Sequence, residues 1–193
     1  MLDRLLQIDT ELLIFLNNLG SEQWDSFWFF LTNQFSWSPL FAFLLFLIFK
    51  KFGWKNGVLL LLFLIVLITF SDQFTNLIKN TFERLRPCNT EGVIEQIRNF
   101  NYKPSSYSFY SGHAASSMTF SFFVILLLKS HYKYIWFLLL FPILFGYSRI
   151  YLGVHYPLDI VSGYFAGIFF GYLFFLLQKK LKLTSRFLKK AII

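Results

Sequence analysis

The chain has 193 residues, of which 56% are hydrophobic and 22% aromatic, and its 18 basic against 10 acidic residues give a net charge of +8. A soluble domain of this length has too little interior for so much apolar surface, so the composition excludes that class and indicates several segments buried in lipid. The single cysteine excludes an internal disulfide bond.

The positive charge follows the apolar runs and does not form a surface for nucleic acid. Basic residues gather in three stretches that contain no acidic residue: Lys50–Lys55, Lys129–Lys133 and Lys179–Lys190. Basic clusters beside membrane spans mark the cytoplasmic side, and no motif that reads nucleic acid accompanies them. The charge therefore predicts a topology in which residues 179–193 form a basic cytoplasmic tail.

Residues 1–34 are predicted to form two amphipathic helices that lie in the membrane interface. Leucines recur at helical spacing from Leu2 to Leu16, but the charged residues among them make this segment too polar to span a bilayer. The stretch Asn17–Gly20 ends it, and a second, aromatic amphipathic segment follows from Trp24 to Leu31. The start lacks the basic region and the small-residue cleavage site of a removable signal peptide.

Residues 36–178 are predicted to form one membrane-embedded bundle, so that the whole chain, 1–193, is a single all-α domain. A helix needs about 20 apolar residues to cross a bilayer. Five stretches fit helical spans: 38–49, 57–79, 114–128, 135–147 and 160–177. Gly163, Gly167 and Gly171 repeat every four residues in the last span, which predicts close helix packing. The predicted fold class is an integral membrane helical bundle of about five transmembrane helices, preceded by interfacial helices.

Residues 81–110 form a long polar connection. A loop of this length is uncommon unless it is functional or disordered, so we predict a catalytic loop, with a short helix from Val93 to Phe100 over the site. Counting spans from the basic clusters places this loop and the turn 148–159 on the same, extracytoplasmic side. Asp72, near the end of the second span, is interpreted as a residue that ties helices together, with a position beside the site as the alternative.

Ionisable residues beside apolar sequence are costly in a membrane protein and mark a functional site. Lys79, Arg86 and Arg149 supply three cations, with Arg84 as a fourth candidate. A guanidinium group binds phosphate oxygens in a bidentate manner, and lysine adds a point charge. Ser111-Gly112-His113 opens the third span, where glycine allows close backbone approach and free N–H groups bind anions. These residues predict a phosphate site.

Two histidines beside such a site suggest a division of labour, in which one attacks phosphorus and the other protonates the leaving oxygen. Asp159 lies one helical turn after His155 and can fix its tautomer. His113 has no acidic neighbour in the sequence and better fits the acid. Taken alone, either histidine would more often be structural. The sequence presents no carboxylate cluster or His-x-x-x-His pair, so we predict a mechanism without a metal or cofactor.

The polar strings occur in a specific order and spacing: Lys79-x6-Arg86-Pro87, Ser111-Gly112-His113 and Ser148-Arg149-x5-His155-x3-Asp159. They resemble the three signatures of the type-2 phosphatidate phosphatase superfamily, over residues 57–178. The resemblance implies a helical bundle that removes phosphate from lipid phosphates through a phosphohistidine intermediate. Tyr110 stands where the family usually has proline, which puts the local backbone geometry in question.

The resemblance also implies a role for each matched residue. The roles are phosphate binding for Lys79, Arg86, Arg149, Ser111 and Gly112, nucleophile for His155, acid for His113 and partner of the nucleophile for Asp159. The compact layout resembles bacterial undecaprenyl-diphosphate phosphatases of the bacitracin-resistance type, which favours undecaprenyl diphosphate as the substrate. Lipid A, phosphatidylglycerophosphate and phosphatidate are the alternatives, because their phosphatases share all three signatures.

A different class of function is a lipid-phosphate transporter or binding protein without hydrolysis. The intact pair of histidines and Asp159 argue against it, since binding alone needs only the cations. A soluble vanadate-dependent haloperoxidase uses similar motifs, but the apolar spans argue against that class. The expected partners are a lipid phosphate substrate and membrane lipids, with no nucleic acid and no obligatory protein partner. The expected location is the bacterial inner (cytoplasmic) membrane, with the active site on the extracytoplasmic side.

Overall fold

The computed structural model describes residues 1–98, 100 and 102–185. These residues contain helices and no strand, which confirms the all-α prediction. The α-helices are α1 (Leu2–Asn18), α2 (Glu22–Thr32), α3 (Ser38–Phe82), α4 (Gly112–Leu128), α5 (Leu140–Tyr151) and α6 (Pro157–Lys180). Short 3-10 helices are η1 (Gln34–Trp37), η2 (Pro87–Asn89), η3 (Ile94–Gln96) and η4 (Lys133–Leu139).

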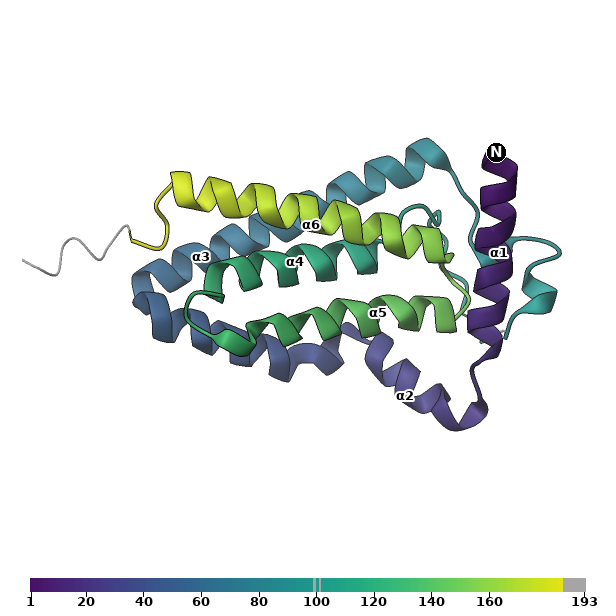
Figure 1. Ribbon diagram of the computed structural model, residues 1–193, viewed down its shortest axis with the longest axis horizontal. Coiled ribbons are helices and arrows are strands. Elements are labelled where there is room, and N and C mark those ends of the chain that lie inside the picture. Colours follow the sequence, from purple (N-terminus) through teal and green to yellow (C-terminus); the bar gives the residue numbers. More distant parts are fainter. Residues whose placement is uncertain (99, 101, 186–193) are drawn as a thin grey trace, which may run out of the picture.

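Helix α3 is a hairpin of two helices that meet at Gly53. This residue has φ 72° and ψ 169° inside an otherwise helical run. Glycine reaches positive φ without a Cβ clash, so the chain can reverse there within one residue. The halves 38–52 and 54–82 run in opposite directions (Figure 1). The first two predicted spans are therefore confirmed as separate helices.

The bundle is completed by α4, by η4 with α5, and by α6, which lie side by side with the hairpin (Figure 1). Three ranges are long and apolar enough to cross a membrane: 34–89, 133–151 and 157–180. Helix α4 is apolar but shorter. The fourth predicted span is wrong at its end, because α5 continues to Tyr151. Arg149 therefore lies in the last turn of α5 and not in a connecting loop, so the helical backbone sets the direction of its side chain.

Helix α4 lies at the centre of the bundle, and α6 packs closely along it. Glycines on α6 make this approach possible: a Cβ on Gly163 would lie 2.8 Å from Ser111 O, and a Cβ on Gly167 would lie 2.7 Å from Ala115 O. Gly171 faces Thr119 O in the same way. Since these contacts are to backbone atoms, no side-chain movement relieves them. The predicted packing role of the glycine face is confirmed.

Helices α1 and α2 lie at one end of the bundle, and α1 crosses that end almost at a right angle to the other helices (Figure 1). Leu13 of α1 is fully buried against the bundle. The opposite face of α1 exposes apolar side chains such as Ile8 and Phe15, and α2 exposes Trp24 and Phe30. A docked inner face with an apolar outer face suits helices that lie in a membrane interface.

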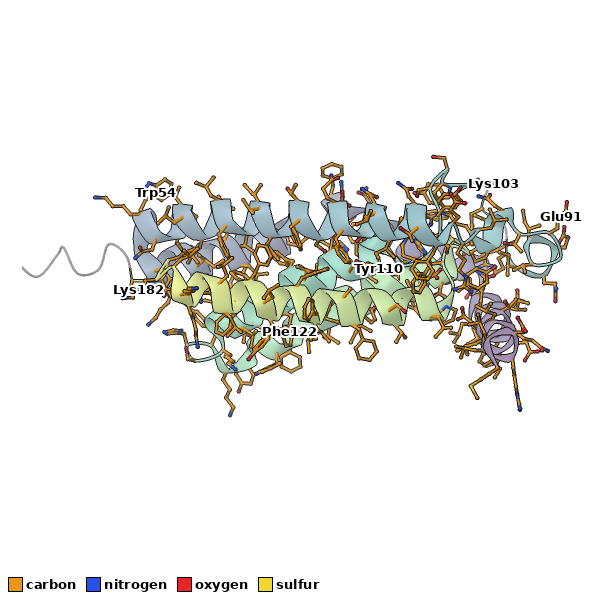
Figure 2. The ribbon with its side chains drawn as sticks, turned by 90° about the horizontal axis from the view of Figure 1, so that it is seen from above. Trp54, Glu91, Lys103, Tyr110, Phe122 and Lys182 are labelled. Carbon is orange, nitrogen blue, oxygen red and sulfur yellow. The ribbon has the colours of Figure 1, made fainter. Side chains whose placement is uncertain are left out.

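The two ends of the bundle differ in charge. Three basic stretches lie at the end of the bundle away from α1: Lys50–Lys55 at the hairpin turn, Lys129–Lys133 after α4, and Lys179–Lys182 at the end of α6. Figure 2 shows Trp54 and Lys182 at this end and Glu91 and Lys103 at the other. Residues 186–193 of the predicted basic tail lie outside the described residues. The arrangement is the one that the predicted topology requires.

The predicted helix from Val93 to Phe100 is wrong. Only Ile94–Gln96 form a 3-10 turn, and Ile97 is extended with φ −113° and ψ 158°. The backbone on either side of Ile97 bonds to α1 instead of to itself. Asn18 Nδ2 donates to Gln96 O at 2.9 Å, and Arg98 N donates to Asn17 Oδ1 at 2.7 Å. Tertiary contacts therefore override local helix formation.

Candidate active site

The predicted site residues come from the ends of four helices and from two connecting loops at the α1 end of the bundle. Lys79 lies in the last turns of α3, Gly112 and His113 open α4, Arg149 closes α5, and Asp159 lies in the first turn of α6. Arg86 and His155 precede η2 and α6. The strings are thus brought together by antiparallel helix packing, which aligns ends that are far apart in the sequence.

Five of these residues line one cavity of about 270 Å³: Lys79, Arg86, Gly112, His113 and His155. Thr75, Asn76, Ser106 and Phe145 line it as well. Asp72 is exposed on the rim of this cavity, and its side chain accepts a hydrogen bond from Asn76 of the same helix. Its interpretation as a tie between helices is therefore wrong. The adjacent Ser71 makes that contact instead, with Thr119 of α4 at 3.2 Å.

Arg86 determines the tautomer of His155. Its Nη1 donates to Nε2 of His155 at 3.0 Å and to Val154 O at 2.9 Å, while Nε donates to Ser106 O at 2.6 Å. A guanidinium group has only donors, so Nε2 must be the acceptor. The proton of the neutral imidazole is therefore on Nδ1, and the unprotonated Nε2 faces the cationic side of the cavity.

The other ring nitrogen of His155 faces Asp159 and Ser108. Nδ1 lies 3.4 Å from Asp159 Oδ2 and 3.3 Å from Ser108 Oγ, and the Ser108 hydroxyl donates to the same carboxylate oxygen. Tyr156 N also donates to Oδ2, at 2.9 Å, so Asp159 caps α6 while it faces the histidine. The serine thus bridges the two groups. No sequence signal separates Ser108 from the other serines of its run.

The charge state of His155 follows from its surroundings. Its side chain is 1% exposed, and three cations, Arg86, Lys79 and Arg149, act on it. Burial in the protein and these positive charges lower the pKa of His155 well below its ordinary value of 6.5. His155 is therefore neutral at pH 7, and the lone pair of its unprotonated Nε2 accepts the hydrogen bond from Arg86.

Lys79 and Arg149 are buried and held by hydrogen bonds. Lys79, 6% exposed, donates through Nζ to Tyr107 O and, at 3.4 Å, to Ser108 O. Arg149, 2% exposed, donates through Nη1 to Thr32 Oγ1 at 2.6 Å, while its Nε has no hydrogen-bond partner within the described chain. A buried donor left unpaired costs about 1–3 kcal/mol. Such a donor suits an anion that arrives with the substrate.

Arg84 was a fourth candidate for phosphate binding, and the structure assigns it other contacts. Its Nη1 lies 2.8 Å from Asp159 Oδ1 and its Nη2 lies 2.7 Å from Asp9 Oδ2. Both terminal nitrogens are thus paired with carboxylates. Among the residues that the structure describes, no group of three or more His, Cys, Asp or Glu side chains is arranged to hold a metal ion.

Hydrogen bonds hold the segment before Gly112, in which Tyr110 stands in place of the usual proline. Tyr110 is 5% exposed and lies inside the bundle (Figure 2). Ser111 N donates to Asp159 O at 3.0 Å, which ties this segment to the first turn of α6. The Ser111 hydroxyl is fully buried and caps α4, where it accepts a hydrogen bond from Ala114 N at 3.4 Å. A tertiary hydrogen bond therefore holds the loop.

Two further cavities adjoin the first. One, of about 360 Å³, is lined by Phe29, Thr32, Asn33, Gln34, Phe35, Tyr102, His113, Arg149 and Leu152. The other, of about 310 Å³, is lined by Gln34, Phe41, Ile68, Ser116, Ser117, Phe120, Phe141 and Phe145. The former mixes amides, hydroxyls and aromatic rings, whereas the latter is mostly apolar. Gln34 lines all three cavities, and nothing in the sequence distinguishes it.

The chain is similar in sequence and in fold to known phosphatases. The sequence model of the PAP2 superfamily matches residues 58–183. The chain is 35% identical to the lipid A 4'-phosphatase of Bacteroides thetaiotaomicron, over 94% of this chain and 81% of that protein. It is 32% identical to an undecaprenyl-diphosphatase of Sulfolobus acidocaldarius, over 84% and 67% of the two chains. The crystal structure of a PAP2-type phosphatidylglycerolphosphate phosphatase from Bacillus subtilis has the same fold, with a TM-score of 0.72 at 19% identity, covering 95% of this chain and 89% of that one.

Proposed function

The chain belongs to the PAP2 superfamily and is a membrane lipid phosphatase, and we propose that it hydrolyses a lipid phosphate through a phosphohistidine formed on His155. One observation carries the proposal. The lone pair of Nε2 lies at the cavity, on a neutral imidazole held between Arg86 and Asp159. A nucleophile must be unprotonated and oriented, and both conditions are met before the substrate arrives.

In the first step, His155 Nε2 attacks phosphorus while the bond between phosphorus and the lipid oxygen breaks. His113, which lines the same cavity, gives its proton to the leaving oxygen. Asp159 and Ser108 accept the hydrogen bond from Nδ1 and stabilise the positive charge on the imidazole. The products of this step are the lipid alcohol and phosphohistidine.

In the second step, a water molecule attacks phosphorus, gives its proton to His113 and breaks the bond to Nε2. Phosphate leaves and both histidines return to their initial states. Throughout, Lys79, Arg86 and Arg149 hold the non-bridging oxygens, because charge-assisted hydrogen bonds stabilise the growing negative charge. The backbone N–H of Gly112, which lines the cavity at the start of α4, completes the phosphate site. The Ser111 hydroxyl, predicted as a further phosphate ligand, is fully buried and does not line this cavity, so it supports the site by capping α4.

The substrate that we propose is a lipid whose phosphate is esterified to a sugar, as in lipid A. The similarity to the Bacteroides lipid A 4'-phosphatase extends over 94% of the chain. The cavity of about 360 Å³ also supports a sugar, because its amide and hydroxyl groups can both donate to and accept from sugar hydroxyls. His113 lines this cavity, so a leaving oxygen near it would belong to a group seated there.

Undecaprenyl diphosphate, which the compact layout of the sequence favours, is the second candidate. The similarity to the Sulfolobus undecaprenyl-diphosphatase supports it. The mostly apolar cavity between the helices would take an isoprenoid chain or an acyl chain equally well. A diphosphate places a second negative group beside the first, and among the described residues Arg149 is the only Lys or Arg side chain that lines the adjacent polar cavity. With so few basic side chains, this cavity favours an uncharged sugar over a second phosphate group.

The proposed orientation places the site on the extracytoplasmic face of the bacterial inner membrane. It is supported by the basic clusters at the opposite end of the bundle. Cysteine labelling of the intact cell with a membrane-impermeant reagent tests it. A cysteine introduced at the exposed Lys103 should be labelled from outside, and one introduced at Lys51 should not.

Phosphate release from purified protein in detergent tests the reaction. We compare lipid A, undecaprenyl diphosphate, phosphatidylglycerophosphate and phosphatidate at equal surface concentration, with and without a chelator. We expect phosphate release to be fastest from lipid A. The chelator should not change the rate, and His155→Ala should abolish release. Release that survives this substitution, or lipid movement across liposomes without any release, would contradict the mechanism and favour a transporter.

A further inference from the structure

Arg84 lies between the N-terminal helix and the proposed catalytic aspartate. Its Nη2 is 2.7 Å from Asp9 Oδ2 in α1, and its Nη1 is 2.8 Å from Asp159 Oδ1 in α6. The guanidinium carbon also stacks over the ring of Tyr156 at 3.8 Å from its centroid. The orientation of Arg84 is therefore set from three sides. One side chain joins two carboxylates that are 150 residues apart in the sequence.

Asp9 is bound on both of its oxygens. While Oδ2 pairs with Arg84, Oδ1 accepts a hydrogen bond from Leu158 N at 2.8 Å, one residue before Asp159. Asp9 is 3% exposed. A buried carboxylate is expensive unless it is paired and hydrogen-bonded, and both requirements are met only while α1 is docked. Helix α1 thus contacts the backbone of the first turn of α6 as well as its side chains.

The two oxygens of Asp159 have different partners. Oδ2 faces His155 Nδ1 and accepts hydrogen bonds from Ser108 and Tyr156 N, whereas Oδ1 pairs with Arg84. Because a carboxylate is planar, holding Oδ1 also sets the direction in which Oδ2 presents its lone pairs. Arg84 therefore acts on the orientation of His155 although it does not line the cavity that contains the histidine.

We propose that Asp9 and Arg84 are positioning residues, through which the docked helix α1 orients Asp159 and His155 for attack. The proposal rests on the proposed function, since it assumes that His155 is the nucleophile. A phosphate-binding role for Arg84 is the competing interpretation. It fits the geometry less well because both terminal nitrogens already pair with carboxylates.

A second ion pair of the N-terminal region supplies a matched control. Asp25 of α2 pairs with Arg98 at 2.8 Å and accepts a hydrogen bond from Tyr151 OH. This pair also fastens an N-terminal helix to the loop and to α5, but it contacts none of the proposed catalytic residues. Asp9→Asn and Asp25→Asn therefore make the same chemical change in equivalent helices, and only the former loosens Asp159.

Steady-state phosphate release in detergent separates the interpretations. We expect Asp9→Asn and Arg84→Met to lower kcat about tenfold or more while KM and the inhibition constant of inorganic phosphate change by less than about twofold. Asp25→Asn should keep kcat near that of the wild type. Arg84→Lys should recover part of the loss, and adding Asp9→Asn to Arg84→Met should lower kcat little further, because the pair acts as a unit.

Three results would overturn the proposal. An equal loss of kcat in Asp25→Asn would assign the effect to general docking of the N-terminal helices. A weaker inhibition by inorganic phosphate in Arg84→Met, with kcat unchanged, would make Arg84 a phosphate ligand. A wild-type protein that releases phosphate from no lipid would overturn the proposed function, and this proposal with it, before any variant is made. Should Arg84→Met fail to fold, Asp9→Asn and Arg84→Lys carry the test.

Discussion

Arg86 Nη1 lies 3.0 Å from Nε2 of His155, so a permanent cation faces the nitrogen that we propose as the nucleophile. This contact has two consequences for the resting enzyme. It keeps the proton on Nδ1, which donates its hydrogen bond to Asp159 and Ser108, and it disfavours a second proton on Nε2. The substrate must displace this contact, and its phosphate oxygens offer the guanidinium better partners.

The acid side of the pH–rate profile should lie well below pH 6.5. Burial and the charges of Arg86, Lys79 and Arg149 lower the pKa of His155, so its nucleophilic form persists as the pH falls. Removing one cation favours the imidazolium, which raises this pKa and moves the acid limb to higher pH. We expect that shift in Lys79→Gln, measured as kcat/KM from pH 4 to 9, which reports the free enzyme. An acid limb that stays in place would contradict the assignment of His155.

Ser108→Ala should lower kcat by about tenfold while the protein remains folded. The hydroxyl bridges His155 Nδ1 and Asp159 Oδ2, and without it the direct contact of 3.4 Å is too long for a strong hydrogen bond. Ser105→Ala is the matched control, because Ser105 is exposed in the same run. Equal activities of the two variants would remove Ser108 from the mechanism.

Gln34→Leu should change the choice of substrate. Gln34 lines all three cavities, and its amide is able to bond to the hydroxyls of a sugar that carries the phosphate. We expect kcat/KM for lipid A to fall about tenfold relative to that for phosphatidate, since each lost hydrogen bond is worth about 1 kcal/mol or more. Gln73→Leu makes the same change at an exposed position of α3 outside these cavities. An unchanged ratio would exclude Gln34 as a specificity residue.

Gly167→Val should lower the melting temperature in detergent. A Cβ at this position would lie 2.7 Å from Ala115 O and 2.9 Å from Thr119 N, so α6 would have to move away from α4. Overpacking of this kind costs about 1–3 kcal/mol. Because α4 and α6 carry His113 and Asp159, activity should fall with stability. A melting temperature equal to that of the wild type would show that the helices separate freely.

The apolar runs and the three signature motifs predicted the helices, the family and the enzyme class of this protein. Apolar runs locate helices because lipid admits only segments whose backbone is satisfied internally, and the hairpin at Gly53 and the packing of Gly163 and Gly167 agree with that reading. The predicted family and enzyme class also agree with the similarity to PAP2 phosphatases. The roles of His113, His155 and Asp159 stay predictions, although the structure does bring these residues together at one end of the bundle.

Other features depend on contacts that no local pattern encodes. Arg84 looks like a phosphate ligand in the sequence, and only the docking of α1 brings Asp9 to it. The helix expected over Val93–Phe100 yields to hydrogen bonds with Asn17 and Asn18. Asp72 faces the cavity rim because of its rotation on α3, which depends on where the neighbouring helices pack.

By itself, the sequence determined the membrane class, the approximate positions of the long helices, the family and most of the groups that we propose for the chemistry, because hydrophobicity and motif spacing are properties of neighbouring residues. The tertiary structure alone decided which of these groups lie together, which ring nitrogen of His155 carries the proton, and which cations are already paired with carboxylates. Ser108, Gln34 and Asp9 acquire their contacts only when helices distant in the chain pack together. Such contacts arise from the geometry of the whole bundle, and a hydrogen bond of about 3 Å cannot be inferred from residue order.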